Sequence, residues 1–117
     1  ASLRSGVGLV KLAVPASVLH YALVIEPGAT GVAMAGDAEQ MLAMLDLADP
    51  DERAVLAVGP GMGDDETMSR LVVQLLSGRR RMVLDADGLR VLARCRAMMP
   101  TDHPPLVRGE VLVCGRV

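Results

Sequence analysis

The sequence predicts an α/β fold with a mainly parallel sheet. Short apolar runs alternate along the chain with longer segments whose apolar residues recur at helical spacing. This alternation implies right-handed crossover connections, which join parallel strands. The apolar residues, 51% of the chain, include one Tyr and no Phe or Trp. The core is therefore aliphatic, which suits helices packed against a parallel sheet.

The first half of the chain is expected to hold two short strands and two helices. Residues 7–14 form an apolar run, and residues 15–23 form a helix that begins with a proline. A turn rich in Gly and Pro precedes a short strand at residues 32–35. Asp37 then caps a helix that ends near residue 48, because its carboxylate can accept the free amides of the first turn.

The second half is expected to continue the alternation. Its strands are predicted at 53–58, 82–84 and 111–113, and its helices at 64–77 and 88–97. The strand at 53–58 is continuously apolar over five residues, so we expect it to be central and buried. Gly78 is placed to end the predicted helix at 64–77.

Charge and cysteine content exclude several classes of partner. The net charge of −2 gives no global positive field, so we expect no nucleic-acid or membrane partner. The only basic run, three arginines at residues 79–81, is expected to be a solvated turn, with an anion contact as the alternative. No apolar run reaches the length of about 18 residues that a membrane span needs. Cys95 and Cys114 match no metal-ligand spacing and suggest a reducing compartment, so we expect a cytoplasmic protein.

The first candidate site is the segment Gly-Pro-Gly-Met-Gly at residues 59–63, here called the glycine loop. It lies between an expected strand and an expected helix, where ligands of open parallel sheets bind. Gly59, Gly61 and Gly63 would let a ligand approach the main chain, and free amides of the helix would favour an anion. The spacing matches neither the dinucleotide fingerprint nor the P-loop. A tight turn without a ligand explains the loop equally well.

The second candidate site is the segment Asp-Ala-Asp at residues 85–87, here called the aspartate loop. Two carboxylates at one strand end could position a hydroxyl, hold a magnesium shell or cap the next helix. Capping by Asp87 is the simplest interpretation. Asp85, which we expect to be buried at the end of its strand, is harder to explain as a cap. His103 lies in a Pro-rich loop, where a lone histidine is usually a surface residue.

Three segments together resemble the ADP/ATP-dependent NAD(P)H-hydrate dehydratases. The pattern of that family includes Arg-Ser-Gly-x-Gly-Leu-Val, Gly-Pro-Gly-x-Gly and Asp-Ala-Asp-x-Leu, which stand here in order at residues 4–10, 59–63 and 85–89. The order and the intervals are more specific than any one segment. The resemblance covers about residues 1–93 and implies a three-layer ribokinase-like fold, in which helices flank a mainly parallel sheet.

The resemblance also implies an activity. Such enzymes repair hydrated NADH and NADPH by phosphorylating the added hydroxyl, with ADP or ATP as donor and Mg²⁺ as cofactor, and then eliminating phosphate and a proton. By resemblance, Gly63, and with it Gly61 and Gly59, would contact this substrate. Asp85 and Asp87 would shape the same crevice. His103 would correspond to the substrate-contacting histidine of the family's Thr-Pro-His-Pro-Gly-Glu segment, although this chain matches that segment only in part.

Other parts of the family pattern are not found in this sequence. The upstream Gly-Gly-Ser and Gly-Ala segments are missing, and so is the Gly-(Thr/Ser)-Gly-Asp loop that carries the catalytic base. The tail from about residue 94 is expected to diverge. We therefore expect residues 1–117 to be a single partial domain, incomplete at both ends, that does not turn over substrate alone.

Two alternatives remain open at this point. One is another ribokinase-like kinase for a small alcohol, and the other is a non-catalytic nucleotide-binding or assembly module. Because a shortened sheet exposes edges and apolar surface, we also expect either a homo-oligomer or poor solubility.

Overall fold

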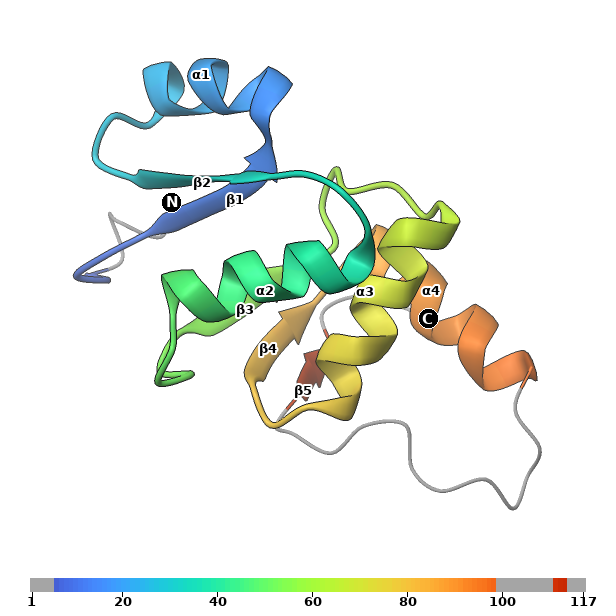
Figure 1. Ribbon diagram of the computed structural model, residues 1–117. Coiled ribbons are helices and arrows are strands. Elements are labelled where there is room, and N and C mark those ends of the chain that lie inside the picture. The colour runs from blue at the N-terminus through green and yellow to red at the C-terminus, as the bar shows by residue number, and fades with distance from the viewer. Residues whose placement is uncertain (1–5, 99–110, 114–117) are drawn as a thin grey trace. The chain divides into compact units, whose positions relative to one another are not determined.

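The computed structural model describes residues 6–98 and the strand at 111–113 (Figure 1). The chain divides into two compact units, Ala1–Pro50 and Asp51–Val117, and each is described by itself. The α/β class predicted from the sequence is confirmed, since helices alternate with strands and every strand pair is parallel. Within the described residues, no helix combines the length and apolarity that crossing a membrane requires.

The first unit pairs two parallel strands and carries two helices. Its elements are β1 (Lys11–Pro15), α1 (Ala16–Ile25), β2 (Thr30–Met34) and α2 (Ala38–Ala48). β1 and β2 pair from Lys11 opposite Thr30 to Pro15 opposite Met34. α1 packs on both strands, and a Cβ added to Gly31 would lie 2.5 Å from the Leu19 Cδ1 atom. Glycine at this position therefore allows the helix to approach the strand closely.

The start of α2 confirms the predicted cap. The Asp37 carboxylate accepts a hydrogen bond from the Gln40 amide, and the Gln40 side chain accepts one from the Asp37 amide, both at 2.8 Å. This reciprocal capping box satisfies two amides that the helix leaves unpaired. At the other end of the helix, the Lys11 ammonium donates to the Ala48 carbonyl oxygen. Sequence and structure therefore agree on both ends of this helix.

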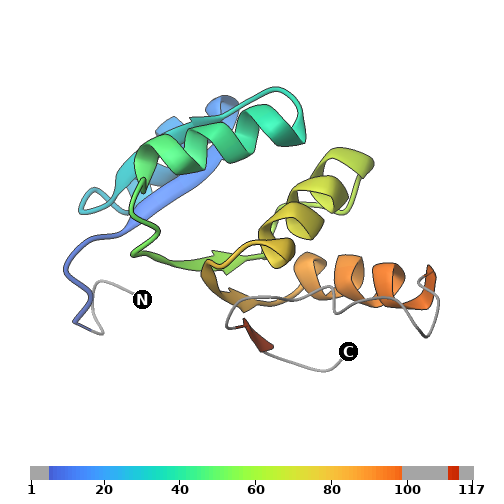
Figure 2. The same cartoon turned by 60° about the horizontal axis from the view of Figure 1, so that its bottom comes forward.

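The second unit is a three-stranded parallel sheet with two helices. Its elements are β3 (Val55–Val58), α3 (Glu66–Ser77), β4 (Arg81–Leu84), α4 (Asp87–Met98) and β5 (Val111–Val113), and the strand order is β3–β4–β5. Consecutive parallel strands joined by right-handed crossovers bring both helices to one face of the sheet. α3 and α4 contact each other there (Figure 2).

The core of the second unit lies between these helices and the sheet. The buried side chains are Leu71, Val72, Leu75 and Leu76 of α3, Met82 and Leu84 of β4, and Leu89, Val91 and Leu92 of α4. The four residues of α3 are among those whose helical spacing predicted that helix, and Leu89 and Leu92 are among those that predicted α4. Burying each large one stabilises the fold by about 2 kcal/mol. This core holds the ends of β3 and β4, from which both candidate loops emerge.

The prediction that residues 53–58 form a central, buried strand is wrong. β3 is an edge strand of the described sheet, and the Val55 side chain is 56% exposed. Leu56 and Val58 are half-buried and share a face with the buried residues of β4, whereas Val55 and Ala57 share the opposite face and are exposed. An apolar run shows that a strand can be covered on both faces, but it does not specify which neighbours cover it.

Smaller differences concern the ends of elements and the basic run. The strand expected at 7–14 begins only at Lys11, and Gly78 ends α3 at a φ of −85°, without the left-handed conformation. The arginines at 79–81 do not form a simple solvated turn, because Arg80 is only 3% exposed. Arg81 belongs to β4 and donates to the Arg53 carbonyl oxygen at 2.9 Å. A run of charged residues in the sequence does not determine which of them are buried, because burial depends on how the apolar part of each side chain packs.

Candidate functional site

The glycine loop and the aspartate loop lie next to each other at the carboxyl ends of β3 and β4. These strands are parallel neighbours with Val58 opposite Leu84, so the loops that follow them begin side by side. The Asp85 amide donates to the Val58 carbonyl oxygen at 3.1 Å and extends the pairing by one residue. The sequence prediction that both motifs stand at strand ends is confirmed, and the structure brings them together.

Gly59 is the point at which the two loops touch. It is buried and has a φ of +130°, and a Cβ added to it would lie 1.8 Å from the Asp85 carbonyl oxygen. Gly88 makes the reciprocal approach, since its added Cβ would lie 3.0 Å from the Val58 carbonyl oxygen. Packing between loops therefore explains why glycine stands at these two positions.

Gly61 and Gly63 differ from Gly59 in what surrounds them. Both are exposed, with φ values of +72° and +77°, and an added Cβ would meet no atom within 4 Å. Between them, the Met62 amide donates to the Gly59 carbonyl oxygen at 3.2 Å and closes a tight turn. The backbone conformation thus favours glycine at both positions, and the space beside them is open to an approaching group.

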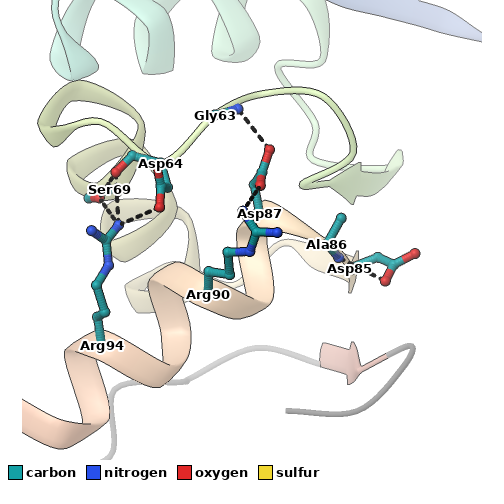
Figure 3. A network of polar contacts seen from close by, with 8 residues as sticks. All are labelled: Gly63, Asp64, Ser69, Asp85, Ala86, Asp87, Arg90 and Arg94. Carbon is teal, nitrogen blue, oxygen red and sulfur yellow. Dashed lines mark hydrogen bonds and ion pairs between the residues drawn. The ribbon is translucent and has the colours of Figure 1, made fainter.

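Asp87 connects the two loops through its side chain. It is the first residue of α4, and its carboxylate is 20% exposed. Oδ2 accepts a hydrogen bond from the Gly63 amide at 3.0 Å, and Oδ1 pairs with Nη1 of Arg90 at 3.2 Å (Figure 3). These contacts replace the simple interpretation that Asp87 caps its own helix. The carboxylate instead fixes the orientation of the Gly63 peptide.

Asp85 and Asp87 do not converge on one point. The Asp85 carboxylate accepts from the amide of Ala86 at 2.7 Å and points away from Gly63 and Asp87 (Figure 3). Ala86 between them has a φ of +47°, an uncommon left-handed conformation that costs about 1 kcal/mol. Asp85 is half-buried, whereas the sequence predicted a buried residue. The pair therefore does not share one ligand position.

A second polar junction lies at the start of α3. Nη2 of Arg94 donates to the Asp64 carbonyl oxygen at 2.8 Å and to Oγ of Ser69 at 3.2 Å, and it lies 3.7 Å from Oδ2 of Asp64 (Figure 3). The hydroxyl of Ser69 also donates to the Asp64 carbonyl oxygen, at 3.3 Å. Arg94 thereby ties α4 to the residue that follows the glycine loop.

The electrostatic character of the site differs from the sequence expectation. Free amides at the start of α3 were expected to favour an anion, but Asp65 caps the helix by accepting from the Met68 amide at 2.9 Å. The Gly63 amide is taken by Asp87. The first turn of α3 also carries Glu66, so carboxylates crowd the position that a phosphate would occupy. These interactions oppose the binding of an anion at this helix end.

Comparison with known proteins identifies the family. A family model described as NAD(P)H-hydrate dehydratase matches residues 1–107. The chain belongs to the NAD(P)H-hydrate dehydratase family. The match extends beyond the span of about residues 1–93 that the three segments cover, so Arg94 lies inside the matched span.

Curated relatives agree with the family assignment. Proteins named bifunctional NAD(P)H-hydrate repair enzyme Nnr match from Pyrobaculum aerophilum, at 37% identity over 90% of this chain, and from Moorella thermoacetica, at 35% identity over 92%. One of the same name from Thermofilum pendens is 30% identical over 90%. The chain spans about a fifth of the length of these relatives, at 22%, 21% and 21%. No solved structure matches the chain significantly.

Family membership supports the dehydratase hypothesis over a small-alcohol kinase, and the ribokinase-like expectation agrees with the parallel α/β units of this chain. His103 lies outside the described residues, so its role stays a prediction. Within residues 6–98 and 111–113, no group of three His, Cys, Asp or Glu side chains could hold a metal ion.

Sequence reasoning missed the arginines that complete the site. Arg90 and Arg94 stand three and seven residues after Asp87, so all three share one face of α4. That spacing is visible in the sequence and could have placed both arginines near the loops. Their partners in the glycine loop and α3 could not be read from the sequence, because those contacts depend on how α4 packs against α3.

Proposed function

We propose that this chain supplies part of the substrate site of an ADP- or ATP-dependent dehydratase for hydrated NADH and NADPH. In this proposal the glycine loop contacts the hydrated nicotinamide nucleotide, with Gly63 foremost and Gly61 beside it. Family membership and the names of the curated relatives support the substrate class. The location of the loop, at the carboxyl end of a strand in a parallel sheet, supports the assignment to a binding site.

The observation that carries the proposal is the open space beside Gly61 and Gly63. Neither position has an atom within 4 Å of an added Cβ, whereas Gly59 is filled by the aspartate loop. A ring can therefore approach the main chain at Gly61 and Gly63 without meeting a side chain. In this proposal Gly59 does not contact the ligand, and its packing against Asp85 holds the glycine loop in place.

The charges around the loop indicate which part of the nucleotide binds there. Asp64, Asp65, Glu66 and Asp87 surround the start of α3. Three of these carboxylates form ion pairs with arginines, Asp64 with Arg94, Glu66 with Arg70 and Asp87 with Arg90, and Asp65 caps the helix. The remaining negative charge disfavours a phosphate and favours an uncharged group that can hydrogen-bond. The hydrated nicotinamide ring, with its carboxamide and added hydroxyl, meets that requirement. We propose that the phosphates of the nucleotide lie away from this loop.

The reaction itself requires groups that this sequence does not show. ADP or ATP, with Mg²⁺, would supply the phosphoryl group that converts the added hydroxyl into a leaving group. The chain contains no Gly-Thr-Gly-Asp or Gly-Ser-Gly-Asp segment, and such a loop provides the base and the amides that stabilise phosphoryl transfer. We propose that the chain, by itself, binds the nucleotide in the cytoplasm without turning it over.

Titration calorimetry on the chain tests the proposal. We expect hydrated NADPH to bind more tightly than NADPH, and inorganic phosphate to show no binding at the same concentrations. Gly63→Ala should weaken the binding of hydrated NADPH about tenfold, because its methyl group fills the open approach and opposes the left-handed φ.

Gly8→Ala is the matched control, since Gly8 has no atom near an added Cβ and no positive φ. Equal binding of phosphate and hydrated NADPH would contradict the assignment of the loop to the ring. Rapid consumption of hydrated NADPH by the chain with ADP or ATP and Mg²⁺ would overturn the claim that it lacks turnover.

A further inference from the structure

The residue after the glycine loop is held by a helix that follows the aspartate loop. Asp64 comes directly after Gly63, and its carbonyl oxygen accepts from both Nη2 of Arg94 and Oγ of Ser69, at 2.8 and 3.3 Å. Arg94 lies on α4 and Ser69 on α3. One backbone carbonyl is thus fixed by side chains from both helices (Figure 3).

A second contact from the same helix fixes the other side of Gly63. Asp87 accepts the Gly63 amide hydrogen at 3.0 Å, and Arg94 donates to the carbonyl oxygen of the following residue, Asp64. Asp87 and Arg94 are seven residues apart, so they lie on one face of α4, two turns from each other. The peptide units around Gly63 are therefore held from both sides by a single rigid element.

We propose that Arg94 is a positioning residue of the glycine loop: it fixes the Asp64 carbonyl group so that Gly63 is held ready for the ligand. This inference rests on the proposed function. Glycine has more backbone freedom than any other residue, so a loop with three glycines in five residues loses much entropy when it is ordered. Contacts that order the loop before the ligand arrives remove that loss from binding.

The contact pattern predicts which substitutions matter. Arg94→Ala removes the donor to the Asp64 carbonyl group and should weaken the binding of hydrated NADPH about fivefold to tenfold. Asp64→Asn keeps the backbone carbonyl and loses only the exposed ion pair at 3.7 Å, so its effect should stay below about twofold. Arg94→Lys retains a charged donor and should restore part of the lost affinity. Arg96→Ala, exposed on the same helix, is the matched control.

Residue-resolved amide exchange tests the same inference without a ligand. Arg94→Ala should raise the exchange rate at Gly63 and Asp64 about fivefold, while the buried amides of Val72 and Leu76 in α3 keep their rates. Unchanged exchange at Gly63 would overturn the positioning role. A uniform rise that includes Val72 and Leu76 would show a general structural role and would overturn it as well.

Binding and exchange together separate this inference from the proposed function. If the chain binds hydrated NADPH and Arg94→Ala loosens Gly63 without weakening that binding, Arg94 does not position the loop for the ligand. If the unsubstituted chain fails to bind hydrated NADPH, the proposed function fails and the positioning role falls with it. In that case the exchange data still report whether Arg94 orders the loop.

Discussion

Gly59 and the Asp85 carbonyl oxygen are in such close approach that a Cβ on Gly59 would lie 1.8 Å from that oxygen. This contact joins the two loops at the carboxyl ends of β3 and β4, and the Gly88 amide donates to the same carbonyl at 3.0 Å. The arrangement of the two loops therefore depends on the absence of one side chain.

Gly59→Ala should destabilise the chain more than any other glycine substitution in the loop. The added methyl group meets backbone atoms that cannot rotate away, and the φ of +130° is unfavourable for alanine. We expect a loss of more than about 3 kcal/mol in the free energy of unfolding, measured by urea denaturation followed by circular dichroism. Gly61→Ala, which has open space at its Cβ, should cost only about 1–2 kcal/mol. Equal losses in the two variants would contradict the contact with Asp85.

Asp87→Ala should release Gly63 from the aspartate loop without unfolding the chain. The substitution leaves the Gly63 amide without its partner and removes the ion pair with Arg90. Because Gly63 is exposed and water can reach its amide, the expected loss in the free energy of unfolding is only about 1 kcal/mol. Asp87→Asn keeps a side-chain acceptor and should cost less. Faster amide exchange at Gly63 in Asp87→Ala, but not in Asp87→Asn, would support the cross-link; equal exchange in both would count against it.

The sequence predicted those features that depend on neighbouring residues along the chain. The cap at Asp37 is encoded by residues three apart, and α3 is encoded by apolar residues at helical spacing. The location of both loops at strand ends followed from the order of the elements. Each of these predictions needs only local chemistry or connectivity.

The features that the sequence did not predict depend on partners far apart in the chain. The edge position of β3 is set by which strands pair with it, and the burial of Arg80 is set by its packing. Asp87 was interpreted as a helix cap because capping involves neighbouring residues. Its carboxylate instead accepts a hydrogen bond from the amide of Gly63, 24 residues earlier. Arg94 was passed over because its partners lie on another helix.

Asp37→Ala should lower the stability of the first unit by about 1 kcal/mol. The Asp37 carboxylate accepts the Gln40 amide at 2.8 Å, and alanine leaves that amide unpaired at the start of α2. Asp37→Asn, which keeps a capping acceptor, should retain most of the stability. Thermal unfolding by circular dichroism measures both variants. Identical midpoints for alanine and asparagine would show that the cap contributes nothing measurable.

Self-association of the chain should depend on α1. No residue of this helix is buried, although it is apolar almost all round, and Val18, Tyr21 and Ile25 are 45%, 68% and 82% exposed. Tyr21 and Ile25 follow Val18 by three and seven residues, so the three side chains form one stripe on the helix. Such a stripe favours burial against another surface, and light scattering on the unsubstituted chain should show particles larger than a monomer.

Charges placed in that stripe test its role. Tyr21→Lys combined with Ile25→Lys should shift the scattering towards the monomer, because association would then bury two charged groups. Ala16→Lys combined with His20→Lys adds the same side chains to exposed positions on the opposite side of α1, so net charge is matched. If both pairs dissolve the assembly equally, repulsion between charged chains rather than burial of the stripe drives the change. A monomeric unsubstituted chain would contradict association through α1 altogether.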